Sequence, residues 1–186
     1  SMNQSSGLLF ARGQKNISIT GFGTIDGQGG NKTFQFGNDA EGGPKRPKII
    51  YFVECKGIVV TDVTLRNSAY WVQHYEKCED VTIRGLKVFS HCNYNNDGLD
   101  IDAKNATISD CYIDVEDDAI CFKSDHPEFC ENITVTNCVT ASNCNAIKFG
   151  TASHGGYRNI AVSNCVVRRA AEDNIRHWSK QLEHIS

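Results

Sequence analysis

The 186-residue sequence has little of several features that would place it in a class at once. It contains three prolines, one methionine and a net charge of −3, with 19 Lys and Arg against 22 Asp and Glu. Without a basic excess there is no electrostatic case for phosphate tracking, so we expect no nucleic-acid partner. No apolar run approaches the roughly 18 residues of a membrane span, so we expect no membrane partner. A hydrophobic share of 40% and a charged share of 22% instead indicate a folded globular chain.

The nine cysteines do not form any familiar motif. There is no CxxC pair and no Cys/His grouping of the kind that holds zinc. An odd number is also atypical of a secreted disulfide scaffold. We therefore expect no metal and no cofactor.

A six-residue phrase recurs along the chain: a polar corner residue, alternating apolar residues, and then Asn, Asp or Gly. It begins at residues 16, 57, 80, 105, 132 and 159. After the first interval the spacing is 23 to 27 residues. This is the length expected for one coil of a stacked solenoid.

A second short strand repeats in the later coils, with an apolar residue followed by an outward-facing one. The pairs are Leu99 and Asp100, Ile120 and Cys121, Ile147 and Lys148, and Ile175 and Arg176. Short β-branched strands with Asn, Gly and Asp corners predict an all-β fold, a right-handed single-stranded parallel β-helix of six to seven coils. A β-sandwich would not repeat a corner phrase in register. We expect one domain over residues 1–186, with a Gly-rich loop at 27–47 leaving the stack.

The repeat gives the cysteines and the Asn corners a structural meaning. Cysteines at equivalent positions of successive coils stack about 4.8 Å apart, so we expect ladders of small buried thiols rather than disulfides. The apparent glycosylation sequons at Asn16, Asn105 and Asn132 occupy one repeated corner, where Asn tolerates left-handed geometry. The stacked cysteines are Cys55, Cys78, Cys130, Cys111, Cys138 and Cys165.

Two acidic stretches occupy equivalent places in consecutive coils. Asp97 and Asp118 each lie three residues before an outward-facing position, so they should stack in one column, with Asp117 beside Asp118. Carboxylates at the same end of adjacent strands repel one another, and a sequence selected for folding alone would avoid this. Such a cluster serves either a metal or acid/base chemistry.

Cationic residues are predicted around this cluster. Lys123, Lys148 and Arg176 fall in neighbouring outward columns, and His154 lies in the loop after Lys148. A carboxylate cluster rimmed by cations suits an anionic substrate better than a bare calcium ion. A surface ion-pair network without activity is the alternative.

Taken together, these motifs resemble a known family, the polygalacturonase-type glycoside hydrolases of family 28. The segment Asn16–Gly29 (NISITGFGTIDGQG) looks like that family's early coil. Asn95-Asn96-Asp97-Gly98 is similar to its Asn-Thr-Asp motif, and Asp117-Asp118 to its paired aspartates. The resemblance covers nearly the whole chain and implies a pectin-degrading β-helix that acts on an acidic, galacturonate-containing polysaccharide.

The resemblance further implies hydrolysis with inversion at the anomeric carbon. Asp117 would protonate the glycosidic oxygen, its proton retained because Asp97 and Asp118 crowd it with like charge. Asp97 and Asp118 would hold and activate water from the opposite side. Acid and base carboxylates should then lie roughly 6.5–9.5 Å apart. The expected substrate-binding residues are Asn95, Lys123, Lys148, His154, Arg176 and Trp178.

The chain departs from the family pattern in two places. The family has a His in the column of Asp97 and Asp118, where this sequence has Asn145, so only its loop could bring His154 back to that place. The family's Arg-Ile-Lys phrase is matched by Arg176-His177-Trp178, with Trp178 in place of Lys. An aromatic ring there could stack on a sugar face, which indicates a neutral or differently decorated residue at the cleavage subsite.

Two other functions stay open on the sequence. One is a β-helix module that binds acidic polysaccharide without cleaving it, or that is too incomplete to act. The other is a calcium-dependent pectate lyase, which has the same fold and would use the carboxylates as metal ligands and an Arg as base.

The family resemblance also bears on the ends of the chain and on its location. It implies further coils after Arg176 and more chain before Ser1, so we expect a domain truncated at both ends relative to the family. An uncapped terminal coil would then allow end-to-end association. Because polymeric pectin lies outside cells, the substrate implies a secreted or periplasmic location.

Overall fold

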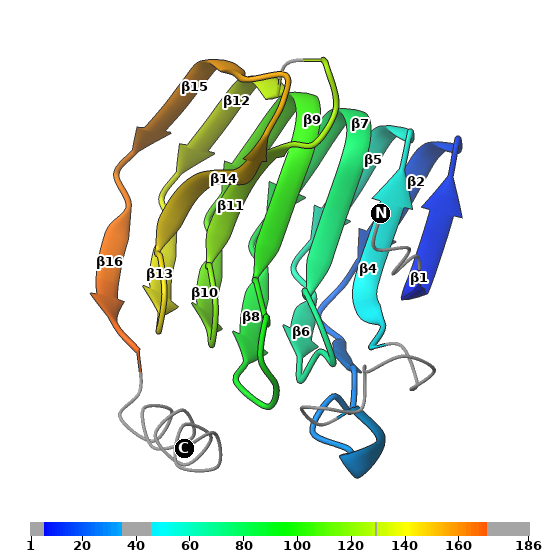
Figure 1. Ribbon diagram of the computed structural model, residues 1–186, viewed down its shortest axis with the longest axis vertical. Coiled ribbons are helices and arrows are strands. Elements are labelled where there is room, and N and C mark those ends of the chain that lie inside the picture. Colours follow the sequence, from blue (N-terminus) through cyan, green and yellow to red (C-terminus); the bar gives the residue numbers. More distant parts are fainter. Residues whose placement is uncertain (1–5, 35–45, 129, 171–186) are drawn as a thin grey trace.

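The computed structural model describes residues 6–34, 46–128 and 130–170. They form a parallel β-solenoid whose strands stack coil upon coil (Figure 1). The right-handed β-helix predicted from the corner repeat is confirmed. No helix in the described ranges is long and apolar enough to cross a membrane.

The first face of the solenoid is a path of six parallel strands in the order β1-β4-β7-β9-β11-β14. Its members are β1 (Gly7–Arg12), β4 (Lys48–Val53), β7 (Gln73–Arg84), β9 (Leu99–Ser109), β11 (Ile120–Ser124) and β14 (Ile147–Ser153). The strand expected at Ile175–His177 lies outside the described residues. Within the described ranges the number of turns differs slightly from the six to seven coils predicted.

The second face continues through the carboxyl-terminal halves of β7 and β9. Its other strands are β2 (Lys15–Thr20), β5 (Lys56–Thr61), β12 (Cys130–Thr136) and β15 (Tyr157–Ser163). Here the apolar residues of the corner phrase pair in register along the stack. The column runs Ile17, Ile58, Val81, Ala106, Ile133 and Ile160.

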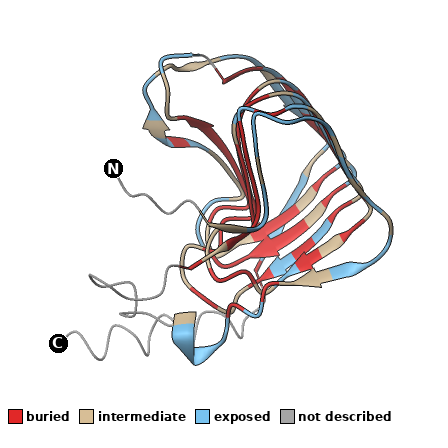
Figure 2. Ribbon diagram, turned by 90° about the vertical axis from the view of Figure 1, so that its right-hand side faces the viewer, coloured by how far each residue is buried: buried red, intermediate tan, exposed pale blue. Residues whose placement is uncertain are grey.

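The third face is a separate six-stranded sheet in the order β16-β13-β10-β8-β6-β3. Its strands are β3 (Thr24–Asp26), β6 (Thr64–Arg66), β8 (Lys87–Ser90), β10 (Tyr112–Val115), β13 (Val139–Ser142) and β16 (Val166–Arg169). The three faces enclose a core of stacked Ile, Val and Leu side chains. Figure 2 shows buried segments recurring at the same place in successive coils.

The corner Asn residues adopt the left-handed conformation that the repeat predicted. The φ angles of Asn16, Asn105, Asn132 and Asn159 lie between 53° and 58°. Their side chains bond along the stack: Asn132 Nδ2 donates to Asn105 Oδ1 at 3.1 Å, and Asn159 Nδ2 to Asn132 Oδ1 at 2.9 Å. The amide ladder explains why Asn recurs at this corner, since one side chain meets both the φ requirement and the hydrogen bonds.

All nine cysteines are free thiols, as expected. Six are buried between coils, Cys165 and Cys92 are partly covered, and Cys144 is exposed. The buried ones behave as small apolar side chains.

The described start of the 27–47 loop packs against the stack. Gly29 N donates to Asn67 O at 2.7 Å, and Asn93 Nδ2 donates to Gly29 O at 3.1 Å. A Cβ at Gly29 would lie 2.2 Å from the Ser68 carbonyl carbon, so glycine is required there. A short 3-10 helix, η1 (Lys32–Phe34), follows, and residues 35–45 lie outside the described residues.

Candidate active site

A regular offset places the candidate residues on the outer side of the first face. In each coil one side chain lies three residues before an outward-facing position of the strand. The outward-facing positions of successive coils pair in register, and they are Tyr51, His74, Asp100, Cys121 and Lys148. The offset pairs are Lys48 and Tyr51, Trp71 and His74, Asp97 and Asp100, Asp118 and Cys121, and Asn145 and Lys148.

A cavity of about 750 Å³ lies over this ladder. It contains the sequence-predicted residues Asn95, Asp97, Asp117, Asp118, Lys123, Lys148 and His154. The rest of its described lining is Tyr70, Trp71, Asp125 and Thr151–Ser153. The two other predicted residues, Arg176 and Trp178, lie outside the described residues.

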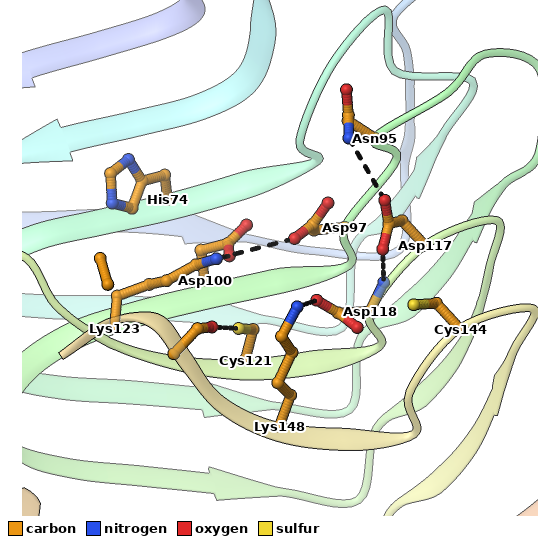
Figure 3. A network of polar contacts seen from close by, with 12 residues as sticks. His74, Asn95, Asp97, Asp100, Asp117, Asp118, Cys121, Lys123, Cys144 and Lys148 are labelled. Carbon is orange, nitrogen blue, oxygen red and sulfur yellow. Dashed lines mark hydrogen bonds and ion pairs between the residues drawn. The ribbon is translucent and has the colours of Figure 1, made fainter. Parts of the chain in front are cut away.

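Asp118 is held as an ion pair. Lys148 Nζ donates to Asp118 Oδ2 at 2.7 Å (Figure 3), and Asn145 Nδ2 donates to Asp118 Oδ1 at 2.7 Å. The hydrogen bond to Asp118 raises the pKa of Lys148. Both oxygens of this nearly buried carboxyl therefore accept hydrogen bonds, one of them from a cationic donor.

Asp97 is in the opposite situation. It is 3% exposed and its Oδ1 has no hydrogen-bond partner in the described structure. Burial, together with the like charges of Asp100 and Asp117, holds the pKa of Asp97 well above its usual range. Sequence reasoning placed the like-charge crowding on Asp117, whereas in the structure the carboxyl whose pKa is raised by burial and by neighbouring like charges is Asp97. The two neighbouring carboxyls therefore have different surroundings: Asp118 is paired on both oxygens, and Asp97 is buried beside like charges.

The surroundings of Lys123 differ from the sequence-based expectation. Its ammonium lies 3.2 Å from Asp100 Oδ1 and 3.9 Å from Asp97 Oδ2, in a side chain that is 7% exposed. Although burial alone would lower the pKa of Lys123, the charges of Asp100 and Asp97 raise it above its ordinary value. Lys123 is therefore engaged by two carboxyls and is not a free cation for a substrate.

The outward columns are also more deeply buried than the alternation suggested. Asp100 and Cys121 are both 0% exposed. Lys123 lies against Asp100, and Cys121 Sγ donates to Gly150 O at 2.8 Å, so neighbouring segments fold over the strand face. The alternation pattern alone gives the direction of a side chain, not what covers it.

Asp117 is half-buried and faces the cavity from the turn before β11. Its Oδ1 accepts from the backbone N–H of Asp118 at 2.9 Å and its Oδ2 from Asn95 Nδ2 at 3.3 Å. Asn95 Oδ1 in turn accepts from Arg46 Nη2 at 3.4 Å. The buried Arg46 therefore orients the Asn95 amide so that its donor end meets Asp117.

The loop after β14 brings His154 into the cavity. The backbone N–H of His154 donates to Ser124 O at 2.7 Å, which fixes this loop against the end of β11. The position in the column itself belongs to Asn145, which bonds Asp118. His154 and the carboxyl cluster therefore line one cavity although they occupy different positions of the repeat.

Sequence reasoning missed three of the lining residues, Tyr70, Trp71 and Asp125. Tyr70 and Trp71 stack with their ring centroids 5.3 Å apart, and Lys123 Nζ lies 4.5 Å from the Trp71 centroid. Applying the three-residue offset to the coil before that of Asp97 would have identified Trp71, which lies three residues before the outward-facing His74. Asp125 follows Lys123 by two residues and carries no comparable signal.

Two groups of side chains have the composition of a metal site. Asp97, Asp118 and Cys121, and likewise Asp117, Asp118 and Cys144, have ligand atoms within 4.8 Å of one another. Burial raises the pKa of both thiols to about 12, with the nearby aspartates adding to the effect. Lys148 and Lys123 already neutralise the same carboxyls. The arrangement suits acid/base chemistry better than metal coordination.

Curated relatives match part of the chain. A probable polygalacturonase of Vitis vinifera is 34% identical over 128 residues, which is 66% of this chain and 25% of that protein. A polygalacturonase of Saccharomyces cerevisiae is 29% identical over 127 residues, or 64% of this chain and 34% of that protein. The chain therefore spans only about a quarter to a third of the length of these relatives.

Solved structures share the fold. An exopolygalacturonase from Thermotoga maritima superposes with a TM-score of 0.74 at 24% identity and covers 88% of this chain and 48% of its own. A family 28 exopolygalacturonase from Yersinia enterocolitica gives 0.66 at 19% identity, covering 92% and 38%. At these identities the likeness speaks for the β-helix alone. The model of the glycosyl hydrolases family 28 matches residues 3–177, so the chain belongs to that family.

Proposed function

We propose that this protein hydrolyses glycosidic bonds in galacturonate-containing, pectin-type polysaccharide with inversion at the anomeric carbon. Membership of the family and the polygalacturonase names of its relatives support the substrate class. One observation carries the chemistry: three aspartates meet in one cavity and differ in surroundings, since Asp118 is paired with a lysine, Asp97 is buried with its pKa raised, and Asp117 is half-buried and faces the cavity. Carboxyls in such different surroundings can divide acid and base roles between them.

In the proposed reaction Asp117 is the general acid. It gives its proton to the glycosidic oxygen as the bond from that oxygen to the anomeric carbon breaks. Asp117 faces the cavity without a cationic partner among the described residues, and its two hydrogen-bond donors stabilise the carboxylate that remains after transfer.

A water molecule adds to the anomeric carbon from the opposite face of the sugar. Asp118, paired with Lys148, takes the proton of that water, and the buried Asp97 holds the water beside it. The products are a new reducing end, with inverted configuration, and the free hydroxyl of the leaving sugar.

The remaining predicted residues are proposed to hold the substrate. Asn95, Lys148 and His154 line the cavity, and Arg176 and Trp178 are carried over from the family resemblance. Lys123 is assigned to the support of Asp97 and Asp100. A polymeric pectin substrate further suggests a secreted or periplasmic location.

The test is a reducing-sugar assay on polygalacturonate, read also for the absorbance of unsaturated products and repeated with EDTA. Hydrolysis that is insensitive to EDTA and gives no unsaturated product is expected. Asp117→Asn should lower kcat by about 10²–10⁴-fold without changing the melting temperature. An active Asp117→Asn variant would contradict the acid assignment.

The same assay separates the other two functions. Unsaturated product that disappears with EDTA would identify a calcium-dependent lyase. Binding of the polymer without any turnover would identify a non-hydrolytic binding module.

A further inference from the structure

We propose that the subsite bordered by Asp125, Tyr70 and Trp71 takes a sugar that is uncharged at C6, such as a methyl-esterified galacturonate or a neutral sugar, rather than a free uronate. This inference rests on the proposed function, because it specifies which pectin-type chain the same cavity binds. It depends on the charges that line the cavity.

The lysines of the described lining are already neutralised. Lys148 is paired with Asp118 at 2.7 Å, and Lys123 with Asp100 at 3.2 Å and Asp97 at 3.9 Å. A free uronate carboxylate would have to compete with these carboxyls for each ammonium. Because the fold already holds the aspartates at these distances from the ammonium groups, the competition favours the aspartates.

Asp125 adds an uncompensated negative charge to this border. It is half-exposed, lines the cavity, and has no ion pair within the described part of the chain. Its backbone N–H donates to Asp102 Oδ2 at 3.3 Å, which fixes the turn that carries it. A uronate seated against Asp125 would meet a like charge, which disfavours binding.

Charged groups behind Asp125 do not reverse this conclusion. Asp125 acts electrostatically on Lys48, Tyr51 and Asp102. Lys48 is buried, its Nζ lies 3.1 Å from His74 Nδ1, and it is absent from the described lining. Burial lowers the pKa of Lys48 to about 8, so near pH 7 its ammonium is still largely charged, but it contacts His74 and not the cavity. Asp102 is a further acid.

The neighbouring aromatic rings suit an uncharged partner. Tyr70 and Trp71 form a half-buried stacked pair at the same border. The ammonium groups of Lys123 and Lys48 lie 4.5 Å and 4.8 Å from the Trp71 centroid, so both cations already contact the indole ring. The border thus offers apolar edges and a hydrogen-bond acceptor, which together match a hydroxyl-bearing neutral sugar.

The test compares the affinity of two ligands for the full chain by calorimetry. The ligands are galacturonate oligomers of equal length, fully methyl-esterified or fully de-esterified, at about pH 7, above the ordinary range of histidine. The Asp117→Asn background prevents turnover. The esterified oligomer is expected to bind several-fold more tightly. Adding Asp125→Asn should tighten binding of the de-esterified oligomer about 5- to 10-fold and leave the esterified one nearly unchanged.

Asp62→Asn is the matched control, since it removes the same charge at a corner of the solenoid outside the cavity lining. It should leave the affinity ratio unchanged. Tighter binding of the de-esterified oligomer by the parent chain, or a ratio unmoved by Asp125→Asn, would overturn the inference. If Asp125→Asn misfolds, the parent chain is tested with added salt instead. Salt should improve binding of the de-esterified oligomer, because salt screens the repulsion between Asp125 and the uronate. Weaker binding at higher salt would overturn the inference.

This binding ratio is independent of catalysis. If the hydrolysis assay shows no turnover while the esterified oligomer still binds better, the proposed reaction fails and the subsite assignment stands. If hydrolysis is found but the de-esterified oligomer binds better, the subsite assignment fails and the proposed reaction stands.

Discussion

Aspartates at equivalent positions of consecutive coils differ in chemistry because their partners differ. Asp118 has a lysine and an amide on its two oxygens, whereas Asp97 has a buried oxygen without a partner. The Asp97–Lys123–Asp100 group places one ammonium between two carboxyls, so one of them is best accommodated as a neutral acid. Residue type alone does not assign the acid and the base.

Asp102 permits a test of this principle away from the reacting residues. Burial raises its pKa from the model-peptide value to about 6. The native state therefore binds the proton more tightly than the unfolded state, and the unfolding free energy should fall as pH rises from about 4 to about 6. Asp102→Asn keeps an acceptor for the Asp125 N–H and removes this loss, which we expect to be about 2 kcal/mol.

Urea denaturation of the parent chain and Asp102→Asn at both ends of this pH window measures the difference. The free energies of unfolding of the two proteins should agree most closely near pH 4. Toward pH 6 the free energy of unfolding of Asp102→Asn should become the larger of the two. Parallel pH profiles would show that the burial of Asp102 carries no such cost. Asp62→Asn provides the control for a change of net charge.

At the scale of the element, the repeating unit is a corner and the strand that follows it. The corner residue has a positive φ angle, in the left-handed region. The strand that follows places its apolar side chains in register with those of the next coil. The three-residue offset on the first face uses the same register to align Asp97, Asp118 and Asn145. The site is therefore a by-product of stacking, built from equivalent positions in consecutive coils.

Asn132 tests the contribution of the corner. Asn132→Ala loses two amide hydrogen bonds and forces a residue with a Cβ to keep a φ of 58°, so we expect a loss of about 2 kcal/mol in unfolding free energy. Asn132→Gly loses the same bonds but tolerates the φ angle and should cost about 1 kcal/mol less. Equal losses in denaturant titrations would mean that conformation does not matter at this corner.

At the scale of the whole molecule, the coils share one continuous core. Buried residues run without a break from the coil of β4 to the coil of β12. Five of the buried cysteines are part of this stack, namely Cys55, Cys78, Cys111, Cys130 and Cys138. Cys121 is buried on the outer face of β11 instead, where its Sγ donates to Gly150 O. The five core thiols can react only when the coils separate, so their accessibility reports on the stacking of the molecule.

We expect a thiol reagent to reach the exposed Cys144 and the partly covered Cys92 and Cys165 in the native protein. Labelling of Cys144 should be slow at neutral pH, because burial and the nearby aspartates raise its pKa to about 12. The five core cysteines should react only on global unfolding, and the total after denaturation without reductant should be nine. A denatured count below nine would reveal a disulfide. Early reaction of Cys130 would show that the coils open independently, whereas early reaction of Cys121 would report only the opening of the segment at Gly150.

The sequence by itself determined the fold and the identity of the acidic cluster. The corner phrase has a period, and a period in a chain of short β-branched strands has few physical solutions other than stacking. Once coils stack, equivalent positions must be neighbours, so the proximity of Asp97, Asp118 and Asn145 follows from counting residues. The left-handed Asn corners and the unbridged cysteines follow for the same reason.

Only the tertiary structure decided the environment of each side chain. Counting residues gives the direction of Asp100, Cys121 and Lys123, but segments distant in sequence fold over them and bury them. Burial and ion pairing depend on all neighbours at once, and these neighbours, such as Trp71, Asp125 and the loop of His154, come from other coils. Protonation is controlled by that combined surrounding, which is why the crowded carboxyl is Asp97 and why Lys123 is bound to aspartates.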